Sequence, residues 1–159
     1  MDSDLSHDPE ALPLLVAAVE SGADLGLGSR YVPGGSIPNW SRWRRAISRF
    51  GNRYARRLLG ISAHDATSGY RIYARRALER IDLDAVRADG YGFQVEMAYL
   101  VERGGGKVVE VPIAFRGRTL GHSKMSARIV VEALVLVTWW GVRDRFRRRR
   151  AHHRVPAAQ

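Results

Sequence analysis

The sequence has no cysteine and almost no lysine, and both absences narrow the possible functions. Without cysteine the chain can form neither a disulfide nor a thiolate metal site. Only two of its 26 basic residues are lysines, so arginine carries nearly all of the positive charge. Arginine binds phosphate groups through paired N–H donors. The formal net charge of +10 therefore favours an anionic partner, such as a phosphate compound or a membrane surface.

Long apolar runs are also missing. The apolar stretch Ala133–Val142 (ALVLVTWWGV) has ten residues, whereas a membrane-spanning helix needs about 20. We therefore expect no transmembrane helix, but a C-terminal helix that can lie at a membrane interface. The 159 residues, of which 45% are apolar, suffice for one domain with a hydrophobic core.

Acidic residues are absent from one strongly basic segment. Residues 42–57 contain seven arginines and no acid, and residues 143–154 contain seven arginines and one aspartate. Apolar side chains recur every three or four residues within 41–59, at Ile47, Phe50, Tyr54 and Leu58, and Trp40 and Trp43 stand at its start. This pattern predicts an amphipathic helix. It lies either on anionic lipid or on the protein surface, with its arginine stems covering the core.

The order of the expected elements predicts an α/β fold. We expect helices over residues 9–20, 41–59, 75–81, 93–103 and 126–148, and strands over 23–28, 70–73 and 107–115. Ser41 is expected to cap the second helix and Gly60 to end it. Pro112 indicates that the last strand lies at a sheet edge or carries a bulge.

Four polar segments are candidates for a functional site. Asp2 and Asp4 can reach one divalent ion if they lie in a turn, and Arg30 follows a strand, where α/β domains bind ligands. The loop 65–71 (DATSGYR) combines a carboxylate, two hydroxyls and an arginine, and the loop 115–124 (FRGRTLGHSK) offers three cations before a helix. A frayed terminus, an exposed arginine and ordinary turns would explain the same residues. No glycine-rich nucleotide motif, nucleophile-elbow serine or zinc-protease motif is present.

Taken in order, five segments resemble dolichol-phosphate (polyprenol-phosphate) mannose synthases, which are family 2 glycosyltransferases. They are DSDLSHDPE (2–10), GSRYVPGG (28–35), DATSGYRIY (65–73), DGYGFQVEM (89–97) and VPIAFRGRTLGHSKMS (111–126). The resemblance implies an α/β fold that is the C-terminal portion of a GT-A (Rossmann-like) domain with amphipathic membrane-surface helices. It implies a partial domain over 1–145, starting at the acidic metal motif, and a basic, disordered tail over 146–159.

The resemblance also implies roles for individual residues. Asp2 and Asp4, with Ser6 two positions further on, would hold the Mg²⁺ or Mn²⁺ that binds the donor diphosphate. Arg30 would bind phosphate near the acceptor, and Arg44 and Ser48 would contact the lipid phosphate. Arg118 and Lys124 would close over the nucleotide diphosphate, while Asp65 and Gln94 would line the site. The catalytic set implied in this way is Asp4, Arg30 and Arg118.

The implied reaction transfers mannose from GDP-mannose to a polyprenyl (dolichyl) phosphate, with inversion at the anomeric carbon. The partners would be these two substrates, an anionic membrane surface and a further membrane domain or protein, and the enzyme would sit peripherally on the cytoplasmic face. Members of the family carry a further half, with the guanine and ribose pocket, before the acidic motif. We therefore expect this chain to be a fragment of the full enzyme.

Three other interpretations remain open at this stage. The first is a polyprenyl-phosphate glucosyltransferase or another family 2 enzyme, and the second is an inactive fragment. The third is a basic nucleic-acid-binding protein that uses residues 42–57 and the arginine-rich tail. No helix-turn-helix, RNA-recognition or zinc-finger signature supports the third, so we expect no nucleic-acid partner.

Overall fold

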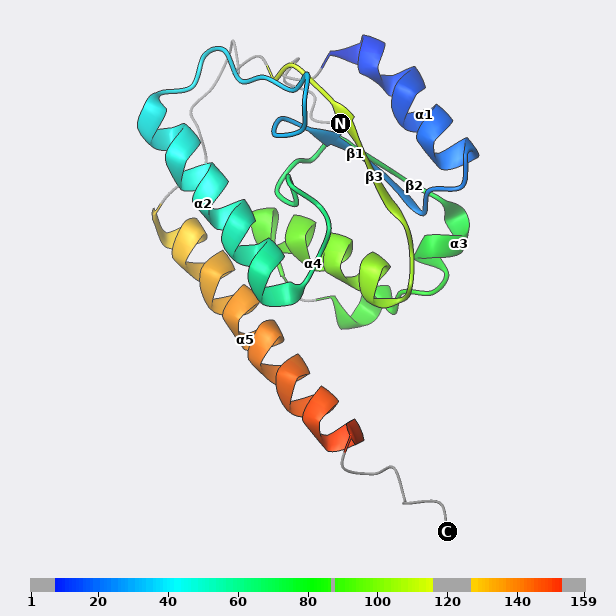
Figure 1. Ribbon diagram of the computed structural model, residues 1–159, viewed down its shortest axis with the longest axis vertical. Helices are drawn as coiled ribbons and strands as arrows, with labels where there is room; N and C mark the ends of the chain where they lie inside the picture. Colours follow the sequence, from blue (N-terminus) through cyan, green and yellow to red (C-terminus); the bar gives the residue numbers. More distant parts are fainter. Residues whose placement is uncertain (1–7, 87, 116–126, 153–159) are drawn as a thin grey trace.

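The computed structural model describes residues 8–86, 88–115 and 127–152, with side chains described for 8–86, 88–115 and 130–145 (Figure 1). The elements in chain order are η1 Pro9–Ala11, α1 Leu12–Glu20, β1 Leu25–Ser29, α2 Arg42–Leu59, β2 Arg71–Tyr73, α3 Arg75–Leu78, η2 Leu83–Ala85, α4 Gly90–Arg103, β3 Val108–Pro112 and α5 Ala127–His152. The α/β class predicted from the sequence is confirmed.

The described strands form one small mixed sheet with β1 in the centre. Its order is β2-β1-β3, and β1 runs antiparallel to β2 and parallel to β3. The sequence of β1, LGLGS, alternates leucine and glycine, so the leucines lie on one face and the glycines on the other. A Cβ at Gly26 would lie 2.9 Å from the carbonyl oxygen of Leu15. Glycine at this position therefore lets α1 pack directly against the strand.

Two hydrophobic cores lie on the two faces of this sheet. The smaller core beneath α1 contains Leu15, Tyr70 and Ile113. The larger core joins the leucines of β1 to side chains of α2, α4 and α5, among them Ala55, Val95, Tyr99, Val137 and Trp140. In Figure 1, α1 lies on one side of the sheet and α2 and α4 on the other.

Helix α2 has the ends that the sequence predicts. The Ser41 side chain accepts a hydrogen bond from the Arg44 N–H (3.3 Å), and Gly60 ends the helix in the left-handed conformation with φ of 70°. Asn52 and Ala55 face the interior, whereas Trp43 and Phe50 are 76% and 62% exposed. The helix therefore presents arginines and two large aromatic rings to its surroundings.

Helix α4 starts earlier than the sequence suggests. The sequence predicts a helix over residues 93–103, but α4 begins at Gly90, so Gly90 and Gly92 both lie inside it. A Cβ at Gly92 would lie 3.2 Å from Cβ of Ala88 and 3.4 Å from Cδ1 of Leu136. This glycine thus allows close packing between α4 and α5.

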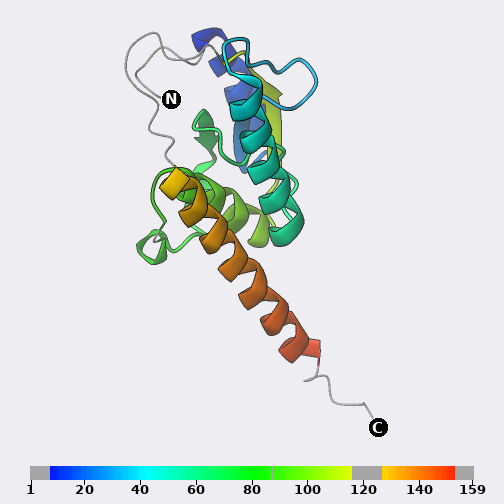
Figure 2. The ribbon, with the colours of Figure 1, turned by 90° about the vertical axis from the view of Figure 1, so that its left-hand side faces the viewer.

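Helix α5 is longer than expected and leaves the body of the domain (Figure 2). It runs to His152, beyond the expected end near residue 148, so residues 146–152 of the expected tail are helical. Gly141 lies where α5 meets α2, and a Cβ there would be only 2.6 Å from Cγ of Leu58. On its outer side Val131, Val135, Trp139 and Val142 are 43–61% exposed. No helix in the described part of the chain is long and apolar enough to cross a membrane.

The last strand is shorter than predicted. β3 covers Val108–Pro112 rather than residues 107–115, and it occupies one edge of the described sheet. Pro112 is its final residue and pairs with Ser29 of β1. The edge position indicated by this proline is confirmed, because a residue without an N–H donor is tolerated there.

Candidate functional site

A buried ion pair between Arg30 and Asp65 forms the centre of the candidate site. Arg30 directly follows β1, and Asp65 lies in the loop before β2. Nε and Nη2 of Arg30 donate to the two carboxylate oxygens of Asp65 at 2.6 Å each, and the backbone N–H of Arg30 donates to the same carboxylate at 2.9 Å. The side chains are only 6% and 0% exposed. The guanidinium is therefore held in one orientation at the end of β1.

Several groups fix Asp65 in turn. Glu110 of β3 accepts a hydrogen bond from the Asp65 N–H (3.0 Å), and its other carboxylate oxygen accepts from the His64 N–H (2.8 Å). The Thr67 hydroxyl lies 3.0 Å from Nη2 of Arg30 and 3.0 Å from Nδ2 of Asn52, which donate to it. The network thus joins α2, β3 and the loop before β2 around one guanidinium.

Arg30 stays charged in this environment. Burial disfavours the charge, but the hydrogen bonds and the negative charge of Asp65 outweigh it and raise the pKa of Arg30 above its ordinary value. The Nη1 group of Arg30 makes no hydrogen bond to any described residue. Its two N–H donors are consequently the part of the guanidinium that can bind an anion.

Aromatic rings enclose this guanidinium. Its Cζ lies 5.5 Å from the ring centroid of Tyr31, 5.2 Å from that of Trp40 and 5.6 Å from that of Phe115. Arg44 of α2 stacks on Trp40 at 4.1 Å, and its buried Nε has no hydrogen-bond partner among the described residues. Trp40 therefore places a second cation next to Arg30.

Tyr31 orients the hydroxyl of Ser48. The Tyr31 hydroxyl donates to Ser48 Oγ at 2.7 Å. Burial raises the pKa of Tyr31, against the opposing effect of that hydrogen bond, so its phenol is protonated near neutral pH and can donate. Because Ser48 Oγ accepts from Tyr31, its own proton is free to bind an acceptor oxygen.

A narrow cavity of about 70 Å³ opens next to these groups. Its polar end is formed by Arg30, Ser48 and Thr67. The remaining lining is mostly apolar and comes from α2, α4 and α5, with Trp40, Ile47, Gly51, Tyr91, Val95, Val130, Ala133, Leu134 and Val137. The cavity therefore combines a cationic, hydrogen-bonding end with an apolar body. This combination fits a ligand with an anionic head and a hydrocarbon tail.

The structure brings together four of the five predicted site residues that it describes. Arg30, Ser48 and Asp65 meet in the network above, and Arg44 lies beside it on Trp40. Gln94 is half-buried on α4 and is not among the residues that line the cavity; its backbone carbonyl accepts a hydrogen bond from Nη1 of Arg71 at 2.6 Å. Asp2, Asp4, Ser6, Arg118 and Lys124 lie outside the described residues.

The predicted metal site depends on those undescribed positions. The described ranges contain no group of three or more His, Asp or Glu side chains placed to hold a metal ion. Asp65, the carboxylate at the centre of the network, already accepts hydrogen bonds from the guanidinium and the backbone N–H of Arg30.

Two elements of the site escaped the sequence analysis. Asn52 donates to the Ser48 carbonyl at 3.0 Å and accepts from the Thr67 N–H at 3.2 Å. An asparagine inside a helix is a usable signal, because asparagine is a weak helix former and is commonly kept for a hydrogen bond. The part of the cavity that α5 lines could not be predicted, because Val130 and Leu134 are far from Arg30 in the sequence and no local pattern relates them to it.

Comparison with known proteins identifies the family. Residues 1–82, just over half of the chain, match the family model described as glycosyl transferase family 2. The chain belongs to glycosyl transferase family 2. The resemblance seen in the sequence is thereby confirmed.

Three curated relatives are similar over most of this chain. It is 52% identical over 151 residues to a polyprenol monophosphomannose synthase of Mycolicibacterium smegmatis, and the aligned region covers 94% of this chain and 57% of that relative. It is also 52% identical over 151 residues to an undecaprenyl-phosphate mannosyltransferase of Micrococcus luteus, covering 95% of the chain and 62% of the relative. A dolichol-phosphate mannosyltransferase of Pyrococcus furiosus is 35% identical over 151 residues, covering 91% and 42%. The chain thus spans about half the length of these relatives.

Proposed function

We propose that the chain carries the acceptor site of an enzyme that transfers mannose from GDP-mannose to a polyprenyl phosphate. The observation that supports this most is the cavity with Arg30 and Ser48 at one end and apolar side chains along the rest. A polyprenyl phosphate has the same division, with an anionic head and an isoprenoid tail. The three relatives, which are named as polyprenol-, undecaprenyl- and dolichol-phosphate mannosyl enzymes, support the same assignment.

The residues of the cavity would hold the attacking group. A phosphate monoester is ionised at neutral pH, so its oxygen can attack the anomeric carbon without a strong general base. Nη1 of Arg30, the Ser48 hydroxyl and Arg44 would bind the other phosphate oxygens and keep the nucleophile oriented. The bond from the anomeric carbon to the GDP diphosphate breaks as the bond to the acceptor oxygen forms, which inverts that carbon. The cations also offset the repulsion between two anionic substrates.

The donor end would use residues outside the described ranges. Family 2 glycosyltransferases generally depend on a divalent metal. Asp2 and Asp4, with Ser6 beside them, would hold Mg²⁺ or Mn²⁺, which when bound neutralises negative charge on a diphosphate. Arg118 and Lys124 would contribute further positive charge to that diphosphate.

The membrane would deliver the acceptor. The outer side of α5 exposes Val131, Val135 and Trp139, and α2 exposes Trp43 and Phe50 among its arginines. Exposed tryptophans next to basic residues are typical of helices that lie in a membrane interface. These side chains support a peripheral position on an anionic membrane. That the membrane face is the cytoplasmic one, and that a further membrane domain or protein lies beside it, are parts of the proposal that this exposure does not test.

The test is a transfer assay on the chain joined to the donor half that the family resemblance implies before the acidic motif, with vesicles that contain polyprenyl phosphate and either Mg²⁺ or Mn²⁺. GDP-mannose is expected to yield a β-linked polyprenyl phosphomannose, whereas UDP-glucose yields no glycolipid. Acceptor binding is measured in the same vesicles without any donor, so that a loss of donor use is distinguishable from a loss of acceptor binding. A glucosylated lipid from UDP-glucose would contradict the mannose assignment. A chain that leaves polyprenyl phosphate unbound would contradict the acceptor site.

A further inference from the structure

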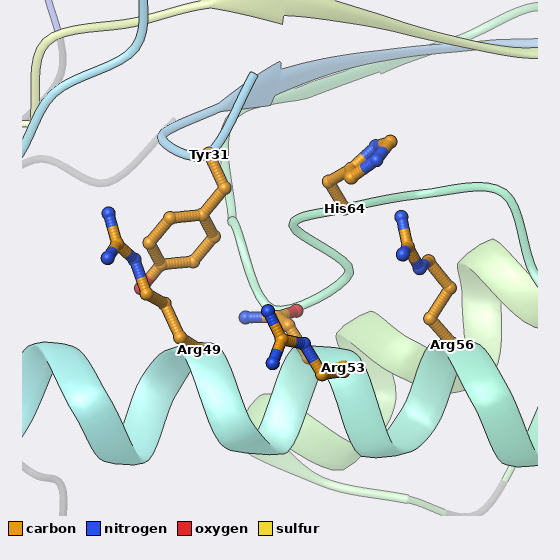
Figure 3. Close-up of a pocket in the computed structure, with 6 residues that line it drawn as sticks. Tyr31, Arg49, Arg53, Arg56 and His64 are labelled. Carbon is orange, nitrogen blue, oxygen red and sulfur yellow. The ribbon is translucent and has the colours of Figure 1, made fainter. Parts of the chain in front are cut away.

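A second pocket, of about 230 Å³, lies between α2 and the chain around Tyr31 and His64 (Figure 3). It is lined by Tyr31, Arg49, Asn52, Arg53, Arg56 and His64. None of these residues lines the cavity that contains Arg30. The second pocket is therefore a separate candidate site. Tyr31 and Asn52 also hold Ser48 and Thr67 in the acceptor network, but the arginines of this pocket have no part in the proposed acceptor chemistry.

One wall of this pocket is cationic. Arg49, Arg53 and Arg56 are spaced by four and three residues and consequently share one face of α2. Figure 3 shows Arg49 and Arg56 pointing from the helix toward the two segments that carry Tyr31 and His64, respectively. Among the described residues, none of the three arginines forms an ion pair with an acidic side chain. Three positive charges thus lie at one pocket with no acidic partner among the described residues.

The opposite wall is fixed by contacts of its own. His64 uses both its backbone N–H and its Nδ1 on the same oxygen of Glu110, at 2.8 Å each. The other oxygen of Glu110 accepts from the Asp65 N–H. Tyr31, on this wall, is bound to Ser48, and Asn52, on the α2 side of the pocket, is bound to Ser48 and Thr67. Of the described carboxylates next to this pocket, Glu110 is therefore committed to the loop and Asp65 to Arg30, so neither forms an ion pair with the three arginines.

We propose that this second pocket binds a phosphate group. Guanidinium groups recognise phosphate through paired N–H donors, and a bound dianion would relieve the repulsion between the three arginines. The phosphate can belong to a soluble phosphate or diphosphate compound or to the head group of an anionic lipid, and both present the same oxygens. If the arginines were merely a solvated basic face, every pair of arginines on α2 would contribute equally to anion binding.

The experiment compares two double variants that each remove two positive charges from α2 of the full chain. R53Q/R56Q changes the pocket, and R42Q/R57Q changes two exposed arginines outside it; glutamine is nearly as good a helix former as arginine. Pyrophosphate and inorganic phosphate are titrated by calorimetry. Co-sedimentation with phosphatidylcholine vesicles, with and without phosphatidic acid, measures lipid binding. Circular dichroism checks that both variants fold.

We expect R53Q/R56Q to bind at least one of these probes about tenfold more weakly than the unaltered chain, and R42Q/R57Q to stay within about twofold. Selective loss of pyrophosphate binding would identify a soluble ligand, and selective loss with phosphatidic acid alone would identify a lipid head group. In the unaltered chain, adding the bound probe should shift the Nε–H NMR signals of Arg49, Arg53 and Arg56 and leave those of Arg42 and Arg57 in place. Equal weakening in both double variants, or no binding of any probe, would overturn the proposal.

Discussion

Replacing Asp65 with alanine is expected to lower the free energy of unfolding by about 3–5 kcal/mol, because it leaves a buried arginine without its counter-charge. Arg30 places three of its donors on this carboxylate, and the two side chains are 6% and 0% exposed. The nearest alternative acceptor, the Thr67 hydroxyl, is neutral and already bound by Asn52. Urea unfolding followed by tryptophan fluorescence measures the change.

A matched control breaks an exposed ion pair instead. Arg75 and Glu79 form an i,i+4 pair at 2.7 Å with side chains 92% and 59% exposed. Because water screens such pairs, Glu79→Ala should cost about 0.5 kcal/mol or less. The double change Arg30→Met with Asp65→Leu should recover much of the loss seen with Asp65→Ala, since it removes both charges together. If Asp65→Ala were as mild as Glu79→Ala, the account of Arg30 as a charge held in place by Asp65 would be wrong.

Replacing Gly51 with leucine is expected to weaken binding of polyprenyl phosphate about tenfold or more and to leave the fold intact. Gly51 lies on α2 and lines the cavity, and a Cβ at this position would meet no atom within 4 Å. A leucine therefore fits without a backbone clash and fills apolar space that an isoprenoid tail would need. Helix propensity should even add about 0.5–1 kcal/mol, because glycine is costly inside a helix.

The control for this change is Gly51→Ala, which shares the gain in helix propensity but leaves most of the cavity open. Acceptor affinity on vesicles and the thermal unfolding midpoint are measured for both variants. We expect Gly51→Ala to bind the acceptor within about twofold of the unaltered chain. If the leucine variant kept its fold and bound as tightly as the alanine variant, the tail would have to lie elsewhere.

The helical part of the fold could be predicted because its determinants are local. Helix α2 (Arg42–Leu59) is predicted by apolar side chains spaced three and four residues apart. Its ends are predicted by Ser41 directly before it and Gly60 directly after it. Glycine was the weaker guide, since Gly60 ends a helix whereas Gly92 lies inside one, against Leu136. The difference lies in the tertiary contact, which no local pattern contains.

The candidate site could be predicted only in part for the same reason. Arg30 and Asp65 were both expected in the site, but their pairing joins positions 35 residues apart and fixes which donors of Arg30 remain available. The aromatic enclosure depends on Trp40 and Phe115, which come from distant parts of the chain. The apolar body of the cavity exists only because α5 packs on α2 and α4. The family resemblance therefore identified individual residues of the site, whereas the shape of the cavity depends on how the helices pack.

The acceptor cavity is tested most directly by photo-crosslinking. A polyprenyl phosphate with a photoreactive group on its first isoprene unit is incorporated into vesicles, and the labelled residues are identified by mass spectrometry. We expect labels on residues that line the cavity, namely Ile47, Val95 and Leu134, and competition by unmodified polyprenyl phosphate. Labels confined to Val135 and Trp139, on the exposed side of α5, would contradict the account, because the lipid would then lie along the outer surface.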